Sequence, residues 1–390
     1  MEVAYAALIA VVLFELLLYT ISYVNPKVRE GLRSRNIEVA PLMLLIDVGK
    51  ASKLEKLSSR VNSKLLRYGL LVAGLLSVAI SATLMYQILV NSVGDLIKAF
   101  SARETYQSPL VPIIPGVTIS LNIIPTLAVV IGFSVAIHEL MHAIASYIEG
   151  VKVESWGLGL FAIFPLAYVK PVEEVFNKAR RLSKFSILSA GVLGNLIVAI
   201  LATALMSFLT PHILLTPVIV DLDRSNPDLP AVKAGLPTPS IIVEVNNTRI
   251  SSIQDFTAFL LKIRNDSVVI ELKVIEAKIE GDIVKPSGGL RTYYLYKPSN
   301  SKLGVYLTEY VSENTSLIVL NAYKTLYWFY IVNFSLALVN ATPVFITDGG
   351  RILSEILKDG RYKLVNYTIQ TLTSSTLALL LIIGLLNALA

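Results

Sequence analysis

The sequence predicts a mainly α-helical, polytopic membrane protein with about six transmembrane helices and one small inserted α+β domain. Three observations indicate this class. Of the 390 residues, 54% are hydrophobic and only 16% are charged, whereas soluble domains average about 25% charged residues. Several apolar runs reach the roughly 20 residues that a bilayer span needs. Between two of these runs, about 100 residues regain the composition of a small soluble domain.

Six segments have the length and composition of transmembrane helices. They are residues 4–24, 68–90, 123–148, 187–209, 323–339 and 372–390. The third and fifth contain polar residues and are less uniformly apolar. Prolines at 112, 115 and 125 interrupt the approach to the third span, where the chain forms either a cap over the outer side or a simple linker.

Lysine and arginine gather in three stretches, residues 25–66, 170–184 and 351–363, while residues 91–122 hold only Lys98 and Arg103. Because basic residues favour the cytoplasmic ends of spans, these three stretches are expected in the cytoplasm. The protein is then expected in the cell membrane with its N-terminus and residues 210–316 outside. This asymmetry explains the net charge of +6. No basic soluble surface with base-stacking aromatic residues is visible, so no nucleic-acid partner is expected.

The spans and loops predict four regions. Residues 1–120 hold the first two spans and a basic loop, in which residues 37–46 are apolar but too short to span and form an interfacial segment or a hairpin. Residues 121–209 and 317–390 form two parts of a membrane core. Residues 210–316 form the extracytoplasmic domain.

The inserted domain has a readable order of elements. Residues 241–250 alternate around an Asn-Asn pair, as in a strand, turn and strand. Residues 252–261 begin with a serine cap and have helical spacing, and residues 268–274 alternate again. With a short helix in residues 226–236, this order resembles a PDZ domain. Such domains bind peptide ends by strand addition. The domain is therefore expected either to capture a peptide or substrate tail or only to restrict access.

The third span contains His-Glu-Leu-Met-His at residues 138–142. The spacing of His138 and His142 places both imidazoles on one helical face, with Cβ atoms about 5–6 Å apart, and this suits two ligands of one Zn²⁺. Glu139 can act as general base. Ionisable residues inside a membrane cost about 2.5–3.5 kcal/mol each and usually serve a function. This span is therefore the predicted catalytic centre.

A zinc site needs a third protein ligand. The chain has no cysteine and only three histidines, which leaves imidazole and carboxylate groups. His212 follows the fourth span on the outer side and is expected to take no part. Asp348 follows the fifth span on the inner side, at the depth expected for the two histidines. Pro343 is expected to end that span, and Gly349 and Gly350 are expected to permit a backbone turn toward the metal.

Together these motifs resemble the site-2 protease family of intramembrane zinc metalloproteases. Asn340-Ala-Thr-Pro343 precedes the Asp-Gly pair, and Gly191-Val-Leu-Gly-Asn195 matches the family's G-x-x-x-N. The resemblance implies that His138, His142 and Asp348 hold Zn²⁺, with Glu139 as general base. It also implies that Asn195 and Asn340 bind the oxyanion or an extended substrate. The implied substrate is a protein with a transmembrane segment in the lipid bilayer.

Residues 156–170 are apolar, contain glycine and are broken by Pro165. They predict either a re-entrant strand pair beside the site, against which a substrate can pair, or a short interfacial loop. Non-helical backbone at membrane depth is tolerated only where protein or a cavity surrounds it.

Three other functions are consistent with parts of the sequence. Membrane zinc endopeptidases of the prenyl-protein and heat-shock type take a third ligand from E-x-x-x-D, and residues 355–359 are Glu-Ile-Leu-Lys-Asp. This stretch is charged, as on a solvated helix face. A transporter would be expected to show matching halves, and the sequence has no internal repeat. A membrane scaffold would not need Glu139.

Overall fold

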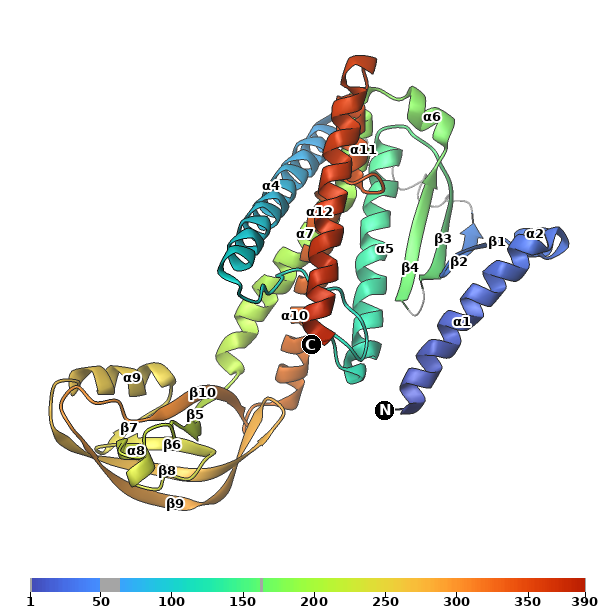
Figure 1. Ribbon diagram of the computed structural model, residues 1–390. Helices are drawn as coiled ribbons and strands as arrows, with labels where there is room; N and C mark the ends of the chain where they lie inside the picture. The colour runs from blue at the N-terminus through green and yellow to red at the C-terminus, as the bar shows by residue number, and fades with distance from the viewer. Residues whose placement is uncertain (1, 50–63, 162–163, 390) are drawn as a thin grey trace. The chain divides into compact units, whose positions relative to one another are not determined.

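The computed structural model describes residues 2–49, 64–161 and 164–389 (Figure 1). The basic residues at positions 50, 53, 56 and 60, which contribute to the expected orientation, lie outside the described residues. The chain divides into two compact units. One comprises Met1–Ala204 with Thr325–Ala390, and the other comprises Leu205–Lys324.

Helices make up most of the first unit. Its long helices are α1 (Glu2–Val24), α4 (Lys64–Ala102), α5 (Ile124–Ile148), α7 (Arg181–Leu209), α10 (Leu317–Ala341) and α12 (Lys363–Leu389). Its shorter helices are α2 (Pro26–Arg33), α6 (Glu173–Lys178), α11 (Asp348–Ile356), η1 (Leu121–Ile123) and η3 (Gly360–Tyr362). The last residues of α7 and the first residues of α10 belong to the second unit. The short helix η2 (Thr210–His212) follows α7 directly in that unit.

Four helical stretches among the described residues are long and apolar enough to cross a membrane, namely 64–102, 121–148, 181–212 and 360–389. The expected first span coincides with α1, of which residues 10–24 reach this standard together with α2, across a bend of 111°. The expected fifth span lies in α10, which is 25 residues long but contains lysine and several tyrosines. The expected count of six spans is therefore not confirmed.

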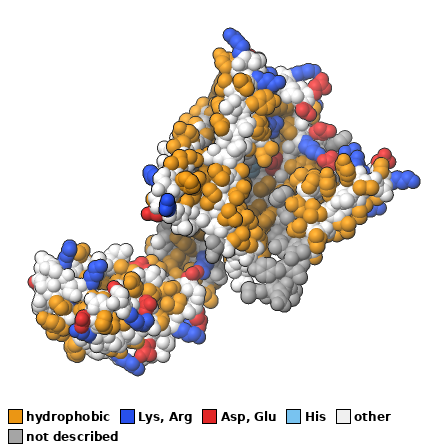
Figure 2. Space-filling view, viewed as in Figure 1, with side chains coloured by type: hydrophobic (Ala, Val, Ile, Leu, Met, Phe, Trp, Pro, Cys, Tyr) orange, Lys and Arg blue, Asp and Glu red, His pale blue; other side chains and the backbone are white. Residues whose placement is uncertain are grey.

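Apolar side chains point outward along the spans. On α4, Val72, Leu76 and Ile80 lie four residues apart on one helical face and are 55–57% exposed. On α12, the exposed residues include Leu372 and Leu379. Figure 2 shows hydrophobic side chains spread over the outer face of the helices. A soluble monomer rarely exposes so much contiguous apolar surface. These faces are suited to contact with lipid.

Helix α7 is the central helix of the first unit. Its residues 186–192 are all buried, because it contacts helices on several sides. Leu188 and Val192 pack with residues of α4, α10 and α11, and Ile187 packs with Ala145 of α5. On α4, a side chain at Gly74 would collide with Ser189. Small residues permit this close packing of membrane helices.

A four-stranded antiparallel sheet lies beside α5 (Figure 1). Its order is β1 (Ile37–Ala40), β2 (Met43–Gly49), β3 (Val153–Phe161) and β4 (Phe164–Pro171). The hairpin alternative for residues 37–46 is thus confirmed, as is the strand pair in residues 156–170, apart from positions 162 and 163, which lie outside the described residues. Strand β4 is an edge strand, and Pro165 contacts α5 at Gly132, where a Cβ would be 2.8 Å from the proline ring.

Residues 103–120 connect α4 to α5 and contact α12. Ser108 donates its hydroxyl to Leu380 O at 2.8 Å, and the amide of Asn387 donates to Tyr106 O at 3.0 Å. A Cβ at Gly384 would collide with Leu110 O. This connection is therefore fastened to the last helix, and Pro125 stands in the first turn of α5.

The second unit contains a six-stranded sheet in the order β5-β10-β9-β8-β6-β7, and β5 also pairs with β6. Its strands are β5 (Leu215–Leu222), β6 (Ser240–Val245), β7 (Thr248–Arg249), β8 (Val268–Glu280), β9 (Ile283–Lys297) and β10 (Val305–Ser312). Its helices are α8 (Pro230–Lys233) and α9 (Ile253–Lys262).

The expected local structure of the second unit is confirmed. Asn246 and Asn247 have φ of 45° and 60°, as a tight hairpin turn requires. Ser252 caps α9 by accepting the N–H of Asp255 at 3.1 Å. Phe256 of that helix is fully buried against the sheet. The likeness to a PDZ domain stays a prediction.

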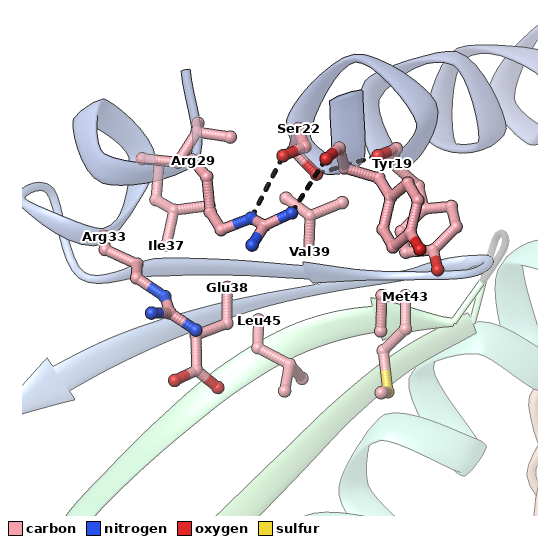
Figure 3. Close-up of a pocket in the computed structure, with 12 residues that line it drawn as sticks. Tyr19, Ser22, Arg29, Arg33, Ile37, Glu38, Val39, Met43 and Leu45 are labelled. Carbon is pink, nitrogen blue, oxygen red and sulfur yellow. Dashed lines mark hydrogen bonds between the residues drawn. The ribbon is translucent and has the colours of Figure 1, made fainter. Parts of the chain in front are cut away.

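A cavity of about 390 Å³ lies between the α1–α2 bend and the β1–β2 hairpin (Figure 3). Arg29 donates to the carbonyls of Ser22 and Tyr23 at 3.1 and 2.8 Å, which satisfies the C-terminal end of α1. This cavity is distinct from the group of titratable residues described next.

Candidate metal centre

Helix α5 brings the two predicted histidine ligands together. The Nε2 atoms of His138 and His142 are 3.1 Å apart. Asp348, the first residue of α11, places Oδ2 at 3.2 Å from each of them. Within the described part of the chain, these residues form the one group of three or more His, Asp or Glu side chains that could hold a metal ion. The structure therefore assembles the three predicted ligands.

The geometry of this triangle fits zinc. In a tetrahedral site with bonds of about 2.0–2.1 Å, neighbouring ligand atoms are about 3.3 Å apart, close to the three observed distances. Asp348 Oδ2 is buried and accepts no hydrogen bond from a described residue, which would be costly for a carboxylate without a cation. Two imidazoles and a buried carboxylate, arranged in this triangle, are a donor set expected of a catalytic zinc site.

Two glycines of α7 allow that helix to approach the ligands. A Cβ at Gly191 would be 2.5 Å from both His138 Cε1 and His142 Nε2, and a Cβ at Gly194 would be 2.6 Å from Met141 Cγ. Real Cβ atoms do not come this close to their neighbours. The G-x-x-x-N motif therefore serves, through its first glycine, to make room for the ligand side chains.

Asp348 is positioned by the first turn of α11, of which it is the first residue. Thr347 caps the helix, with its hydroxyl oxygen accepting the N–H of Gly350 at 3.2 Å. Gly349 and Gly350 are helical and do not have positive φ, so the turn toward the metal does not depend on unusual backbone angles at these residues. They are needed because a Cβ would collide with Ala341 O at the first and with Val344 O at the second. The close approach, rather than unusual φ, positions the carboxylate.

Each histidine is oriented through its other ring nitrogen. His142 Nδ1 is 2.7 Å from Ile187 O, and a carbonyl oxygen can only accept. His138 Nδ1 is 2.6 Å from Asn195 Oδ1. Such partners fix the ring and direct Nε2 to the metal. Asn195 is fully buried and contacts His138, whereas the motif resemblance implied a contact with the oxyanion or substrate.

Glu139 lies beside the ligands and next to the sheet. Its Oε2 accepts the backbone N–H of Val169 in β4 at 3.0 Å. The carboxylate is half-buried and is not one of the three grouped ligands. A glutamate held next to a metal by one backbone donor retains lone pairs that can accept a proton.

The remaining candidates lie elsewhere or make no contact. Asn340 is half-buried near the end of α10 and has no side-chain hydrogen bond with the described residues. His212 is exposed and contacts Phe208, with ring centroids 6.2 Å apart. Glu355 pairs with the buried Lys184 at 3.1 Å, and it is outside the metal group. The rival E-x-x-x-D ligand is therefore engaged in an ion pair.

The sequence analysis missed two residues that contact this machinery. Asn333 of α10 is fully buried, and its Oδ1 accepts from Asn195 Nδ2 at 3.1 Å. Its position inside an apolar span was the available signal. Val169 acts only through its backbone, and the side chain at that position gave no indication of a role.

Comparison with known proteins bears on this site directly. The family model of Peptidase family M50 matches residues 126–384, a range that contains all three ligands and Glu139. The chain belongs to Peptidase family M50. This is the site-2 protease family, so the resemblance in the motifs is confirmed. The M50 chain is a membrane metalloprotease, and the members of its family are zinc enzymes.

An archaeal relative covers most of the M50 chain. It is an uncharacterized protein of Methanocaldococcus jannaschii, 28% identical over 299 residues, which are 75% of this chain and 74% of the relative. The match shows similarity over much of both proteins, but the relative's name states no activity.

Proposed function

We propose that this M50 protein is an intramembrane zinc endopeptidase that hydrolyses a peptide bond in or near a transmembrane segment of another protein. The observation that carries this proposal is the triangle of His138, His142 and Asp348, with Glu139 beside it. These residues belong to a unit whose long helices expose apolar side chains on their outer faces. A zinc site of this composition on apolar helices is suited to a substrate that lies in the bilayer.

The chain's residues divide the chemistry among them. Zn²⁺, when bound by the three ligands, supplies Lewis acidity and lowers the pKa of water toward about 7. Glu139 is placed to take a proton from the attacking water and to return it to the leaving amine. The Asn340 amide makes no hydrogen bond with the described residues, and it is the better candidate for a contact with the substrate or oxyanion, since Asn195 is committed to His138.

The edge of β4 supports the binding of substrate as an extended strand. Val169 directs its N–H away from β3 and toward α5. Because strand peptide groups alternate in direction, Ala167 presents its N–H and C=O to the same side. An unpaired strand edge can accept an added strand. Substrate pairing here would unwind a transmembrane segment next to the metal ligands and expose its peptide bond.

The basic loops support a site toward the cytoplasm, with residues 210–316 outside the cell membrane. In this arrangement the outer domain, by binding a peptide tail or by obstruction, would favour substrates already shortened on their outer side. Purified full-length enzyme in vesicles should then cut a trimmed single-span substrate faster than the same protein with its ectodomain. Such selection of shortened substrates is what regulated intramembrane proteolysis requires of this enzyme. Equal cleavage rates for the two substrates would contradict it.

Cleavage itself is tested with wild type and Glu139→Gln in vesicles containing a single-span substrate. Wild type is expected to give two fragments whose masses place the cut in or near the span, and E139Q is expected to give none. The amide keeps the size of the side chain but cannot accept the proton. Undiminished cutting by E139Q, or cutting confined to soluble loops, would overturn the proposal.

A further inference from the structure

A chain of buried side chains links His138 to the middle of α10. His138 Nδ1 contacts Asn195 Oδ1 at 2.6 Å, and Asn195 Nδ2 donates to Asn333 Oδ1 at 3.1 Å. Asn333 Nδ2 donates to Phe329 O and to Ser134 Oγ, both at 2.8 Å. Asn195, Asn333 and Ser134 are all fully buried. No water competes for these groups, so their donors and acceptors must match one another.

The direction of every hydrogen bond follows from the far end of this chain. Phe329 O is a backbone carbonyl and can only accept, so the atom of Asn333 that faces it must be the NH₂ group. Ser134 agrees, because its hydroxyl donates to Val130 O at 2.6 Å and its lone pairs remain free to accept. Asn333 Oδ1 must therefore face Asn195.

The same reasoning continues to the metal ligand. Asn195 has to present its NH₂ group to Asn333 Oδ1, since the opposite orientation would bring two oxygens together. Its own Oδ1 then faces His138, whose Nδ1 must carry the proton. The neutral imidazole carries its one proton at Nδ1, and Nε2 keeps the lone pair that a metal needs. The amide of Asn333 thus decides which nitrogen of His138 can bind zinc.

We propose that Asn333 is a positioning residue that fixes the Nδ1-protonated, metal-binding tautomer of His138 through Asn195. Asn333 does not touch the ligand triangle. It acts by preventing Asn195 from rotating its amide by 180°, a change that would offer His138 a donor and favour a proton on Nε2. His142 does not need such a device, because Ile187 O is its partner.

Asn333→Leu removes the amide that imposes the constraint and puts an apolar side chain of similar size in the same buried position. We expect zinc affinity, measured by competition with a chelator, to fall at least about tenfold, as for other residues that orient metal ligands. Asn387→Leu is the matched control. Asn387 also joins separate segments through its amide, with Ser108 N and Tyr106 O, but has no contact with the ligands. This variant should bind zinc like wild type.

A double variant separates tautomer control from packing. In N195D/N333L the carboxylate can only accept, so it should hold His138 Nδ1–H without Asn333. Zinc affinity is expected to recover to within about threefold of wild type, because carboxylate–histidine pairs are effective in metal sites. Loss of zinc that N195D does not restore would assign Asn333 to packing alone and would overturn the proposal.

The tautomer is read directly by ¹⁵N NMR of metal-free protein in detergent, labelled on histidine. With three histidines in the chain, the spectrum is small, and His142→Ala and His212→Ala assign it. The readout is the proton on His138 Nδ1, because Asp348 Oδ2 lies 3.2 Å from Nε2 and affects that nitrogen in metal-free protein. Nδ1 should be fully protonated in wild type and only partly protonated in N333L.

The proposal rests on the proposed metal site, but the two can fail separately. A wild-type protein that binds no zinc would refute the proposed function. A wild type that binds zinc, with an unchanged His138 spectrum and affinity in N333L, would refute the role of Asn333.

Discussion

Glu139 is joined to the sheet by one hydrogen bond, from the backbone N–H of Val169 to Oε2 at 3.0 Å. Strand β4 therefore holds the expected general base, and its edge is the one to which the proposed substrate would pair. Pro165 fixes the same strand against Gly132, two helical turns before Glu139. The strand follows α5 over about 10 Å of helix, so its position and that of the carboxylate depend on each other.

Replacing Val169 with proline tests this hydrogen bond. The substitution removes the N–H that serves Glu139 but no bond of the sheet, and proline is tolerated on edge strands. We expect kcat to fall by about tenfold to a hundredfold, because a hydrogen bond to a charged group contributes about 1.5–3 kcal/mol. Zinc content should be unchanged. Val169→Ala keeps the N–H and reports the contribution of the side chain alone; equal losses of kcat in both variants would contradict the account.

Gly191→Ala is expected to damage the metal centre. Its Cβ would be 2.5 Å from atoms of both histidine ligands, so α7 and α5 must separate, at a cost of about 1–3 kcal/mol. Zinc affinity, measured by chelator competition, should fall with the activity. Gly69→Ala in α4 is the control, because nothing lies within 4 Å of its added Cβ. A zinc affinity in G191A equal to that of G69A would contradict this role of the glycine.

The sheet beside the site contains a carboxylate, Asp47, whose contribution to the stability of the fold depends on pH. Asp47 Oδ1 accepts the hydroxyls of Tyr168 at 2.6 Å and Ser155 at 2.9 Å. The bond from Tyr168 lowers the pKa of Asp47, against the opposing effect of burial. A lowered pKa means that this stabilisation is present above the usual carboxylate pKa and is lost as the pH falls through the folded-state value.

Tyr168→Phe should therefore lower the free energy of unfolding at neutral pH. The variant should also lose less stability than wild type when the pH is lowered, because its Asp47 pKa is closer to the usual value. The expected loss is about 0.5–1.5 kcal/mol, at the low end for a hydrogen bond to a charged group, because Asp47 is half-buried and screened by solvent. Thermal unfolding in detergent, followed from neutral to acidic pH, measures it. If wild type and Y168F differ by the same amount at every pH, the Asp47 contact does not provide the stabilisation.

Glu355→Ala is expected to lower stability and leave zinc in place. Its partner Lys184 has a side chain only 5% exposed, and a buried charge that loses its partner costs about 3–5 kcal/mol. Lys184→Met combined with Glu355→Leu should regain much of the stability. Loss of zinc in folded E355A would instead favour the prenyl-protein type of metal site.

The chemistry of the site could be predicted from sequence because it rests on local spacing. His138 and His142 are one turn apart on a helix, and the apolar run around them holds few other groups that can ligate zinc. Asp348 followed from its depth beside a span. The strand pair and the hairpin in residues 37–46 were open alternatives, since short apolar runs suit strands and interfacial helices alike.

Other features depend on contacts between distant segments. That Gly191 faces the histidines, that Gly349 and Gly350 admit carbonyl oxygens, and that Asn195 contacts His138 all require the packing of α5, α7, α10 and α11. Val169 gave no signal because a backbone N–H is common to almost every residue. Asn333 could have been noticed as a buried amide in an apolar span, although its partner could not.

The central claim is tested most directly by metal analysis of purified wild type, Asp348→Ala and Glu139→Gln, with cleavage of a single-span substrate measured on the same samples. The account predicts one zinc per chain in wild type and E139Q, little zinc in D348A, and cleavage by wild type alone. Full zinc occupancy in D348A, or cleavage by E139Q at the wild-type rate, would contradict it.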